Sequence, residues 1–381
     1  MKKRIIVLTM LVLCLAACSN RKSTAVVSPA SEFQVADSLA VSPKYAKGFS
    51  VSYLSENVTL LDIQDPEGVE VNSFHYALVQ KGSKVDIPQG YTRLETPVGK
   101  VICMTSLQLS NFIHLGLTDL VVGVTSTRHL FNETVNRQIK EKKTHKIGIE
   151  GNFDTEVIIA INPDVIFISP FKRGGYDAIK NIDIPSVPHL GYKELTPLGQ
   201  AEWIKVVGLL TGNEAAANKS FKIIEDRYNE LKALTAQVAH RPTVMSGQMQ
   251  SGYWYAPGGK SFLAQMFADA GADYFLKDNP ESGGVKIDYE TAYEKAADTD
   301  YWRMVNSFKG EWSYDVLRAE DERYTDFKPY KNHGVVYCNM TQVPFYERMP
   351  IEPHEVLADF IAVFHPELLP DHTPRYYHLV K

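Results

Sequence analysis

Hydrophobic and polar positions alternate in short runs in the first part of the chain. Three such runs, 49–53, 57–63 and 74–79, are separated by turn-forming segments such as 65–68. Alternation bounded by Gly, Pro and Asp is typical of half-buried strands joined by turns. We therefore predict a small antiparallel β extension over residues 45–97.

From Val98 onward the pattern changes to strands that alternate with helices. An apolar strand at 101–104 precedes a helical stretch at 107–115, which stops at Gly116 and is followed by a strand at 120–124. A glycine directly after the last helical turn is a common left-handed terminator. This alternation predicts a mostly parallel sheet covered by helices.

The second half of the chain repeats this plan. A strand at 243–246 precedes a helix at 261–270, which stops at Gly271. An Asp-x-Glu sequence also recurs: 154–156 is followed by an aspartate eight residues after the glutamate, and 288–290 is followed by one at the same distance. These two aspartates are Asp164 and Asp298. The repeat predicts two similarly built lobes, 98–212 and 240–381.

A long amphipathic helix is predicted between the lobes, over residues 213–239. One face carries Phe221, Ile224, Tyr228, Leu231 and Leu234, and the other carries charged residues. The predicted fold class is therefore α/β: two similar lobes with mostly parallel sheets, joined by one long inter-lobe helix, plus the N-terminal β extension.

The first residues have the layout of a secretory signal. A basic cluster at 2–4 precedes an apolar run at 5–13 and the small-residue segment 15–18. This segment resembles a bacterial lipobox, so residues 1–18 are interpreted as a lipoprotein signal peptide in which Cys18 is lipidated. Residues 19–44 are rich in small and polar residues and predict a flexible tether.

Composition narrows the function classes. With 44% hydrophobic and 22% charged residues the chain is ordinary globular protein, and a net charge of −5 disfavours nucleic acid as a partner. Cys103 and Cys338 lie in apolar, strand-like runs and are expected to be buried structural thiols. No apolar run after residue 18 is long enough to cross a membrane, so attachment is expected through the lipid only.

Several segments, in order and spacing, resemble one family: the substrate-binding proteins of ABC importers for ferric siderophores, haem and cobalamin. The segments are 99–106, 119–124, 147–166, 270–272 and 288–290. The resemblance covers roughly Val98 to Lys381. It implies a monomeric, non-enzymatic receptor without a resident cofactor, which delivers a metal chelate to an ABC permease and faces the periplasm of a bacterial cell envelope.

The same resemblance assigns a role to the repeated glutamates. In this family a surface glutamate on each lobe docks onto arginines of the permease, and the matching positions are Glu156 and Glu290. Two carboxylates on rigid lobe tips would form a two-point footprint on a basic partner. Alternatively, each only stabilises the dipole of the helix that it opens, worth about 0.3–1 kcal/mol.

The ligand is expected between the lobes, at loops that follow the carboxyl ends of the strands. Cationic side chains there would pair with anionic oxygens of a ferric complex, and aromatic rings would cover its flat faces. The predicted ligand-binding residues are Ser106, Arg128, Phe171, Lys172, Arg173, Trp254, Tyr255, Trp312 and Arg348.

Alternatives remain open for the cargo and for the class of protein. A ferric siderophore is preferred, with haem or cobalamin as the alternatives; a bare zinc or manganese ion is disfavoured because the 11 histidines are scattered. Segment 257–261 has the tail of a phosphate-binding loop, but Trp254 occupies the position of its first glycine, so a glycine turn opening the next helix is preferred. For the class of protein, the alternative to an importer receptor is a lipid-anchored enzyme or scavenger that works without a permease.

Overall fold

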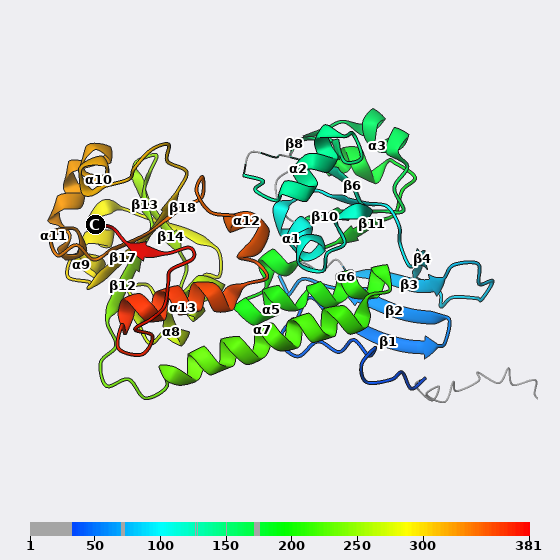
Figure 1. The fold of residues 1–381 in the computed structure, drawn as a ribbon, viewed down its shortest axis with the longest axis horizontal. Helices are drawn as coiled ribbons and strands as arrows, with labels where there is room; N and C mark the ends of the chain where they lie inside the picture. Colours follow the sequence, from blue (N-terminus) through cyan, green and yellow to red (C-terminus); the bar gives the residue numbers. More distant parts are fainter. Residues whose placement is uncertain (1–32, 70–72, 126, 128, 150, 171–175) are drawn as a thin grey trace, which may run out of the picture.

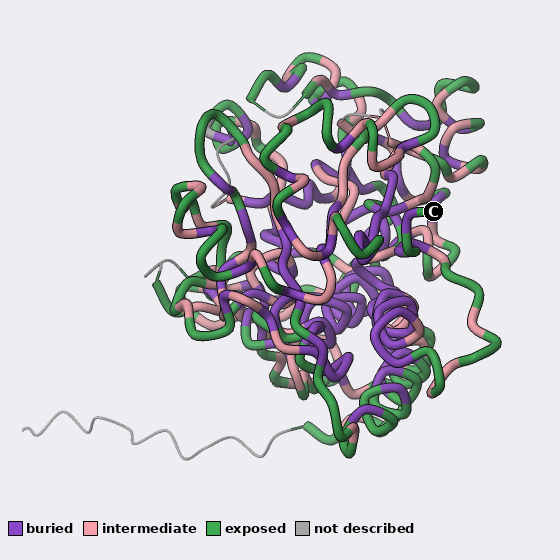
Figure 2. Tube along the Cα trace, turned by 90° about the vertical axis from the view of Figure 1, so that its left-hand side faces the viewer, coloured by how far each residue is buried: buried purple, intermediate pink, exposed green. Residues whose placement is uncertain are grey.

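The computed structural model describes residues 33–69, 73–125, 127, 129–149, 151–170 and 176–381. Two α/β lobes stand side by side, and the long helix α7 (Glu214–Leu234) runs beneath both (Figure 1). Positions in the lobe interiors and in the helical layer beneath them are buried, whereas the outer rims are exposed (Figure 2). The predicted two-lobe α/β class with an N-terminal sheet is confirmed.

The N-terminal extension is a four-stranded sheet whose pairing differs in part from the prediction. β1, β2 and β3 pair antiparallel in sequence order, but β3 pairs with β4 in parallel. The extension was therefore wrongly predicted to be wholly antiparallel, because the run that forms β4 gave no clear alternation. The strands are β1 (Phe49–Ser55), β2 (Val58–Ile63), β3 (Phe74–Gln80) and β4 (Thr92–Thr96).

The sheet of the N-terminal lobe is parallel throughout, with strand order β11-β10-β5-β6-β7. Thr105 and Gln108 form a capping box at the start of α1, and Gly116 ends the turn after it with a φ of 70°. The elements are β5 (Val101–Cys103), α1 (Ser106–His114), η1 (Thr118–Leu120), β6 (Val121–Val124), α2 (Glu133–Lys140), β7 (His145–Lys146), β8 (Gly148–Ile149), β9 (Asn152–Phe153), α3 (Thr155–Ile161), β10 (Val165–Ile168), α4 (Asp177–Lys180), β11 (Ser186–Pro188) and η2 (Gly191–Lys193).

Three helices form the layer that joins the lobes: α5 (Pro197–Glu202), α6 (Ile204–Thr211) and α7. Every residue of α6 is buried, and α7 packs against it closely because a Cβ at Gly208 would lie 2.5 Å from that of Ala217. The apolar face of α7 is buried as predicted as far as Leu231. Leu234 is 43% exposed, since the helix ends there, so its predicted place on the buried face was wrong.

The C-terminal lobe has a sheet of order β15-β12-β17-β18-β19, parallel except for the last pair, and a smaller antiparallel sheet, β13-β14-β16. Its elements are β12 (Thr243–Ser246), β13 (Gln248–Gln250), β14 (Tyr253–Pro257), α8 (Phe262–Asp269), β15 (Asp273–Tyr274), β16 (Gly284–Ile287), α9 (Tyr289–Ala296), β17 (Tyr301–Asn306), α10 (Tyr314–Glu320), η3 (Glu322–Asp326), α11 (Lys328–Lys331), β18 (Val335–Asn339), α12 (Phe345–Arg348), α13 (Pro353–Phe364) and β19 (His378–Leu379).

The Asp-x-Glu repeat is present in both lobes, but the aspartate that follows it in the second lobe was matched wrongly to Asp164. Asp164 precedes β10, and its carboxylate accepts a hydrogen bond from the backbone N–H of Lys100 beside it at 3.2 Å. In the second lobe the residue in the equivalent position is Asp300, not Asp298. Asp300 precedes β17, and its carboxylate accepts a hydrogen bond from the backbone N–H of Thr243 at 2.9 Å. The helix preceding this aspartate is longer in the second lobe, which shifts the spacing.

The two thiols within the described part of the chain are buried, as predicted, in β5 and β18. Burial raises the pKa of both, that of Cys338 to about 12. Because the thiolate is the reactive form, protein purified without residues 1–18 is expected to resist a thiol reagent at pH about 8 and to react at both cysteines in guanidinium. Rapid labelling of the native protein would contradict this.

Candidate ligand-binding site

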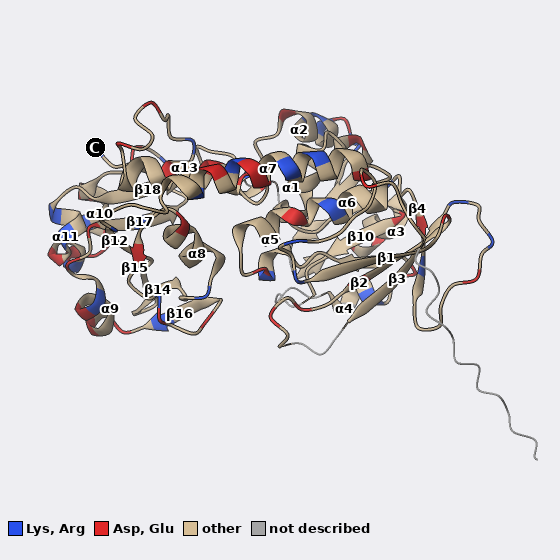
Figure 3. Cartoon of the chain, turned by 90° about the horizontal axis from the view of Figure 1, so that it is seen from below, with Lys and Arg blue, Asp and Glu red and all other residues tan. Residues whose placement is uncertain are grey.

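A cavity of about 570 Å³ lies between the two lobes. Its walls come from η2 and the residues that follow it on one side, and from β13, β14, α8, β17 and the loop before β16 on the other. Figure 3 shows β14, β16 and α8 on the side of the C-terminal lobe that faces α5. The lining residues are Glu67, Tyr192, Lys193, Glu194, Leu195, Gly247, Gln248, Gln250, Tyr255, Pro257, Ser261, Phe262, Leu263, Ser282, Gly283, Gly284, Arg303, Met304 and Val305. This mixture of aromatic, aliphatic and a few charged groups is typical of small-molecule sites.

Tyr255 reaches the cavity because of the alternation along β14. Its neighbours Trp254 and Ala256 point into the core of the C-terminal lobe, while Tyr255 is 39% exposed. Its phenol lies over the neighbouring strand at Gly284, where a Cβ would come within 2.0 Å of the Tyr255 hydroxyl oxygen. Only glycine at this position leaves room for the ring.

Arg303 is the cation that the C-terminal lobe contributes to the cavity. It is half-buried in the central strand β17, and its Nε donates to the hydroxyl of Tyr377 at 3.0 Å; a terminal guanidinium nitrogen donates to the same oxygen. Burial raises the pKa of Tyr377, so that phenol is neutral. Arg303 lines the cavity, and among the described residues no carboxylate pairs with it, so its charge has no anionic partner in this part of the chain.

The prediction from sequence missed Arg303, although a signal was present. A single arginine between Trp302 and Met304, in a strand that reads as central, is unusual because buried charges are normally paired.

The glycine turn before α8 explains the segment that imitates a phosphate-binding loop. Ser261 caps α8 by accepting from the N–H of Ala264 at 3.2 Å. A Cβ at Gly258 would lie 2.2 Å from the carbonyl oxygen of Glu281, so the glycine permits close backbone packing. The predicted role as a turn that opens the helix is confirmed.

A second pocket of about 520 Å³ lies on another part of the lobe interface, lined by α1, α12 and their neighbours. Here the lobes touch directly: the N–H of Phe131 donates to the carboxylate of Glu347 at 2.9 Å, and the rings of His129 and Tyr346 lie 5.7 Å apart. Arg348 lines this pocket, and its guanidinium binds Glu352 at 2.8 Å. Its cation is therefore already paired within the protein.

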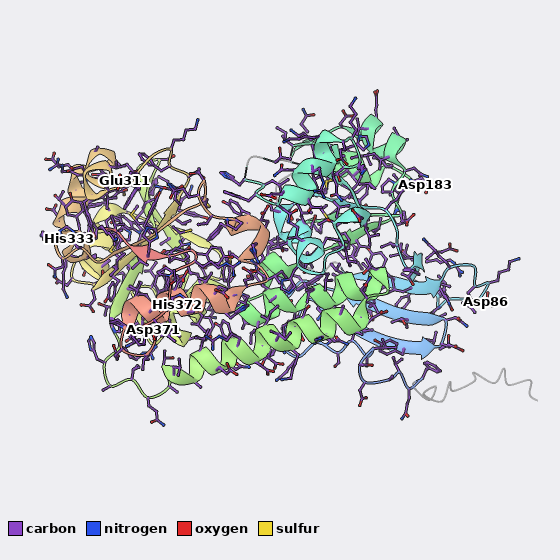
Figure 4. All side chains as sticks on the ribbon, in the orientation of Figure 1. Asp86, Asp183, Glu311, His333, Asp371 and His372 are labelled. Carbon is purple, nitrogen blue, oxygen red and sulfur yellow. The ribbon has the colours of Figure 1, made fainter. Side chains whose placement is uncertain are left out.

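No group of three or more metal-ligating side chains was found within the part of the chain that the structure describes. His333 lies at the outer edge of the C-terminal lobe, and His372 lies near α13, bound to Asp359 at 2.7 Å (Figure 4). Among the described residues, no helix has both the length and the apolar character needed to cross a membrane.

Comparison with known proteins identifies the family. A model described as periplasmic binding protein matches residues 101–340, which is more than half of the chain. The chain belongs to the periplasmic binding protein family.

Relatives and solved structures agree with this family. A lipoprotein of Methanocaldococcus jannaschii is 28% identical over 353 residues, which cover 85% of this chain and 82% of the relative. A heme-binding protein from Pseudomonas aeruginosa has a TM-score of 0.56 and 15% identity, covering 74% of this chain and 98% of the other. The molybdate-bound protein MolA from Haemophilus influenzae has a TM-score of 0.56 and 16% identity, covering 72% of this chain and 88% of the other. An Fe3+-hydroxamate transport protein from Saccharomonospora viridis has a TM-score of 0.55 and 17% identity, covering 71% of this chain and 94% of the other. At these identities the structures establish the fold alone.

Periplasmic binding proteins are non-catalytic transport components that deliver their ligand to an ABC permease. The expectation of a substrate-binding protein of an ABC importer is confirmed at this level, and the alternative of an enzyme is set aside.

The structure places the predicted ligand-binding residues of this periplasmic binding protein unevenly. Tyr255 lines the larger cavity, Arg348 lines the second pocket, and Ser106 begins α1 without lining either. Two predictions need correction: Trp254 is fully buried, with its indole N–H donating to the carbonyl of Ser246 at 3.0 Å, and Trp312 is 7% exposed and stacked on a tyrosine. The other predicted site residues lie outside the described residues: Arg128, Phe171, Lys172, Arg173 and Cys18.

The two glutamates predicted to dock onto the permease have matching local settings. Glu156 and Glu290 are exposed in the first turns of α3 and α9, one on each lobe. Both helices are capped by the aspartate two residues earlier: Asp154 accepts from an N–H at 3.0 Å and Asp288 at 2.7 Å. Neither glutamate lines a cavity, so the docking role stays a prediction that is independent of ligand binding.

Proposed function

We propose that this protein captures a ferric siderophore-type iron complex in the inter-lobe cavity and delivers it to its ABC permease. The observation that carries the proposal is Arg303, a cation without a carboxylate partner among the described residues, which lines a cavity that is also lined by Tyr192 and Tyr255. A guanidinium pairs well with chelating oxygens, and the rings suit the organic part of a chelate. The likeness to the Fe3+-hydroxamate protein is consistent with this choice.

The size of the cavity favours an organic complex over a small oxyanion. At about 570 Å³ it falls within the range of roughly 300–1,000 Å³ that is usual for drug-sized ligands. An ion such as the molybdate bound by MolA would leave most of this space unfilled. Haem and cobalamin are of a size to need at least this volume, and they are the alternative ligands that the experiment must distinguish.

We also propose that the protein is anchored by a lipid on Cys18, with the residues that follow it as the tether. The predicted tether, residues 19–44, extends too far toward the fold, because Val41 is buried and the side chain of Asn218 donates to the carbonyls of Ser38 and Ala40 at 3.0 Å. The relative from M. jannaschii is named a lipoprotein, which supports this proposal and an extracytoplasmic location. The curated relatives are archaeal, so the bacterial cell envelope stays a prediction.

Tryptophan fluorescence offers a direct test of the ligand. The indole N–H of Trp302 donates to the carbonyl of Gly247, a cavity residue, at 2.9 Å, so a ligand in the cavity lies close to this fluorophore. Tag-free protein would be titrated with ferric siderophores, haem, cobalamin and free metal ions. Saturable quenching by a ferric siderophore is expected; quenching by haem or cobalamin alone would overturn the proposed cargo while leaving the transport role.

Replacing the cavity cation tests the site itself. Arg303→Gln is expected to weaken binding of an anionic ferric siderophore by about tenfold to hundredfold, because a hydrogen bond to a charged group contributes about 1.5–3 kcal/mol. Arg303→Lys should recover part of the affinity. Arg318→Gln, the same substitution at an exposed ion pair of α10, is the matched control and should bind like the wild type. Equal affinities of all four proteins would place the ligand elsewhere.

A further inference from the structure

The C-terminal segment, residues 372–380, supplies a partner for the cavity cation, although it follows the residues that the family model matches. The match ends at residue 340, whereas Tyr377 lies directly before β19. The hydroxyl of Tyr377 accepts from Nε of Arg303 at 3.0 Å and from a terminal nitrogen of the same guanidinium. Tyr377 is 1% exposed and does not line the cavity, so any effect on a ligand there passes through Arg303.

A buried carboxylate of α13 fixes the backbone of this segment. Asp359 is fully buried, and its two oxygens accept from three consecutive backbone N–H groups at 2.7–2.9 Å. These are the N–H groups of Arg375, Tyr376 and Tyr377. The same carboxylate binds the imidazole of His372 at 2.7 Å. These contacts with one helix determine where the side chain of Tyr377 begins.

The order of the strands brings the segment within reach of Arg303. β18 lies between β17 and β19, and Val336 pairs with Arg303 on one side and with Leu379 on the other. The side chain of Tyr377 therefore crosses β18 to reach the guanidinium. Its ring packs on that of Phe360 in α13, with the ring centroids 4.8 Å apart. Both the backbone and the ring of Tyr377 are thus held in place.

The phenol holds the guanidinium without neutralising it. Burial raises the pKa of Tyr377, so its hydroxyl stays protonated and uncharged. A carboxylate in the same place would hold Arg303 equally well but would cancel its charge. The phenol oxygen occupies one edge of the planar guanidinium, and among the described residues the N–H groups on the other edge have no hydrogen-bond partner.

We propose that Tyr377 is a positioning residue for ligand binding, which holds the guanidinium of Arg303 in one orientation and leaves its charge to the ligand. The C-terminal segment, anchored by Asp359, thereby belongs to the binding site without touching the ligand. The inference rests on the proposed function, because it takes Arg303 as the cation that contacts the iron complex. A side chain that is oriented beforehand loses less freedom when the ligand binds.

A double-mutant cycle at Arg303 and Tyr377 tests the proposal. Tag-free wild type, Tyr377→Phe, Arg303→Gln and the double variant are titrated by fluorescence quenching with ferric enterobactin, an anionic tris-catecholate, and with ferrichrome, a neutral tris-hydroxamate. For each probe whose binding Arg303→Gln weakens, Tyr377→Phe is expected to lower the affinity by about three- to tenfold, the cost of ordering one long side chain. In the Arg303→Gln background it should change the affinity by less than about twofold.

Tyr376→Phe is the matched control. Tyr376 is the preceding residue and is equally buried, but its hydroxyl donates to Glu352 at 2.8 Å. Both substitutions keep the ring and remove one buried hydroxyl from the same segment, so a general loosening of the segment would appear in both variants. Tyr376→Phe is expected to bind like the wild type. Circular dichroism checks that every variant is folded.

The outcomes separate this inference from the proposed function. Wild-type affinity in Tyr377→Phe, or an equal loss in Tyr376→Phe, would overturn the role of Tyr377 and leave the proposed function standing. A loss of the same size with and without Arg303 would also overturn it, because Tyr377 would then act independently of the cation. So would binding that Arg303→Gln leaves unchanged, or a Tyr377→Phe protein that does not fold. Binding of neither probe by the wild type would overturn the proposed function and this inference together.

Discussion

Reversing both Glu156 and Glu290 to lysine is expected to reduce ligand uptake in cells to background while leaving the affinity of the purified protein unchanged. The side chains are exposed on different lobes and line neither cavity, so the substitutions leave the binding site intact. A permease surface that pairs arginines with both carboxylates would instead meet two like charges. Either reversal alone should lower uptake by about tenfold or more, because one of the two contacts with the permease is lost. Some uptake should remain, because the other contact is intact.

The matched control uses exposed acids with the same place in a helix. Glu133 on α2 and Asp315 on α10 each lie in a first turn, one on each lobe. Their double reversal makes the same change in net charge and loses the same helix-dipole stabilisation, about 0.3–1 kcal/mol per site. It should leave uptake near the wild-type level. Normal uptake in the Glu156 and Glu290 double variant would refute the docking role.

Glu202→Gln is expected to destabilise the protein by about 3–5 kcal/mol. The carboxylate is fully buried; it accepts from the N–H groups of Lys44, Tyr45 and Ala46 at 2.7–3.0 Å and binds the ammonium of Lys205 at 2.7 Å. A glutamine leaves the mostly buried Lys205 without its anion and offers only one acceptor oxygen. Denaturant-induced unfolding of tag-free protein measures the change.

This substitution should also loosen the extension, since the segment before β1 loses its anchor. Limited proteolysis is expected to cut the chain near residue 44 faster than in the wild type. Glu230→Gln, at an exposed pair with Arg227, is the control and should change the free energy of unfolding by less than about 1 kcal/mol. If both variants lost a similar free energy of unfolding, the burial of Glu202 would contribute nothing to the stability of the protein.

The arrangement of elements could be predicted because each depends on local chemistry. The capping box at Thr105, the terminal glycine at 116 and the buried stripe from Phe221 to Leu231 are encoded in residues a few positions apart. Patterns of this kind were sufficient to predict the two lobes and the inter-lobe helix, and to recognise the family resemblance. The repeat was visible too, although a local pattern cannot tell that Asp300, rather than Asp298, caps the neighbouring strand.

The ligand site depended on contacts that no local pattern contains. Alternation placed Trp254 and Tyr255 on opposite faces of a strand, but the packing of β14 on β16 decided that the tyrosine faces the cavity. Arg303 and Glu67 come from a central strand and from the extension, and they share one cavity only after both lobes have folded. The sequence by itself thus determined the lobes, their helix and the two exposed glutamates, because hydrophobic period and capping act over a few residues. Only the tertiary structure decided which charges line the cavity, because that depends on which distant segments pack against one another.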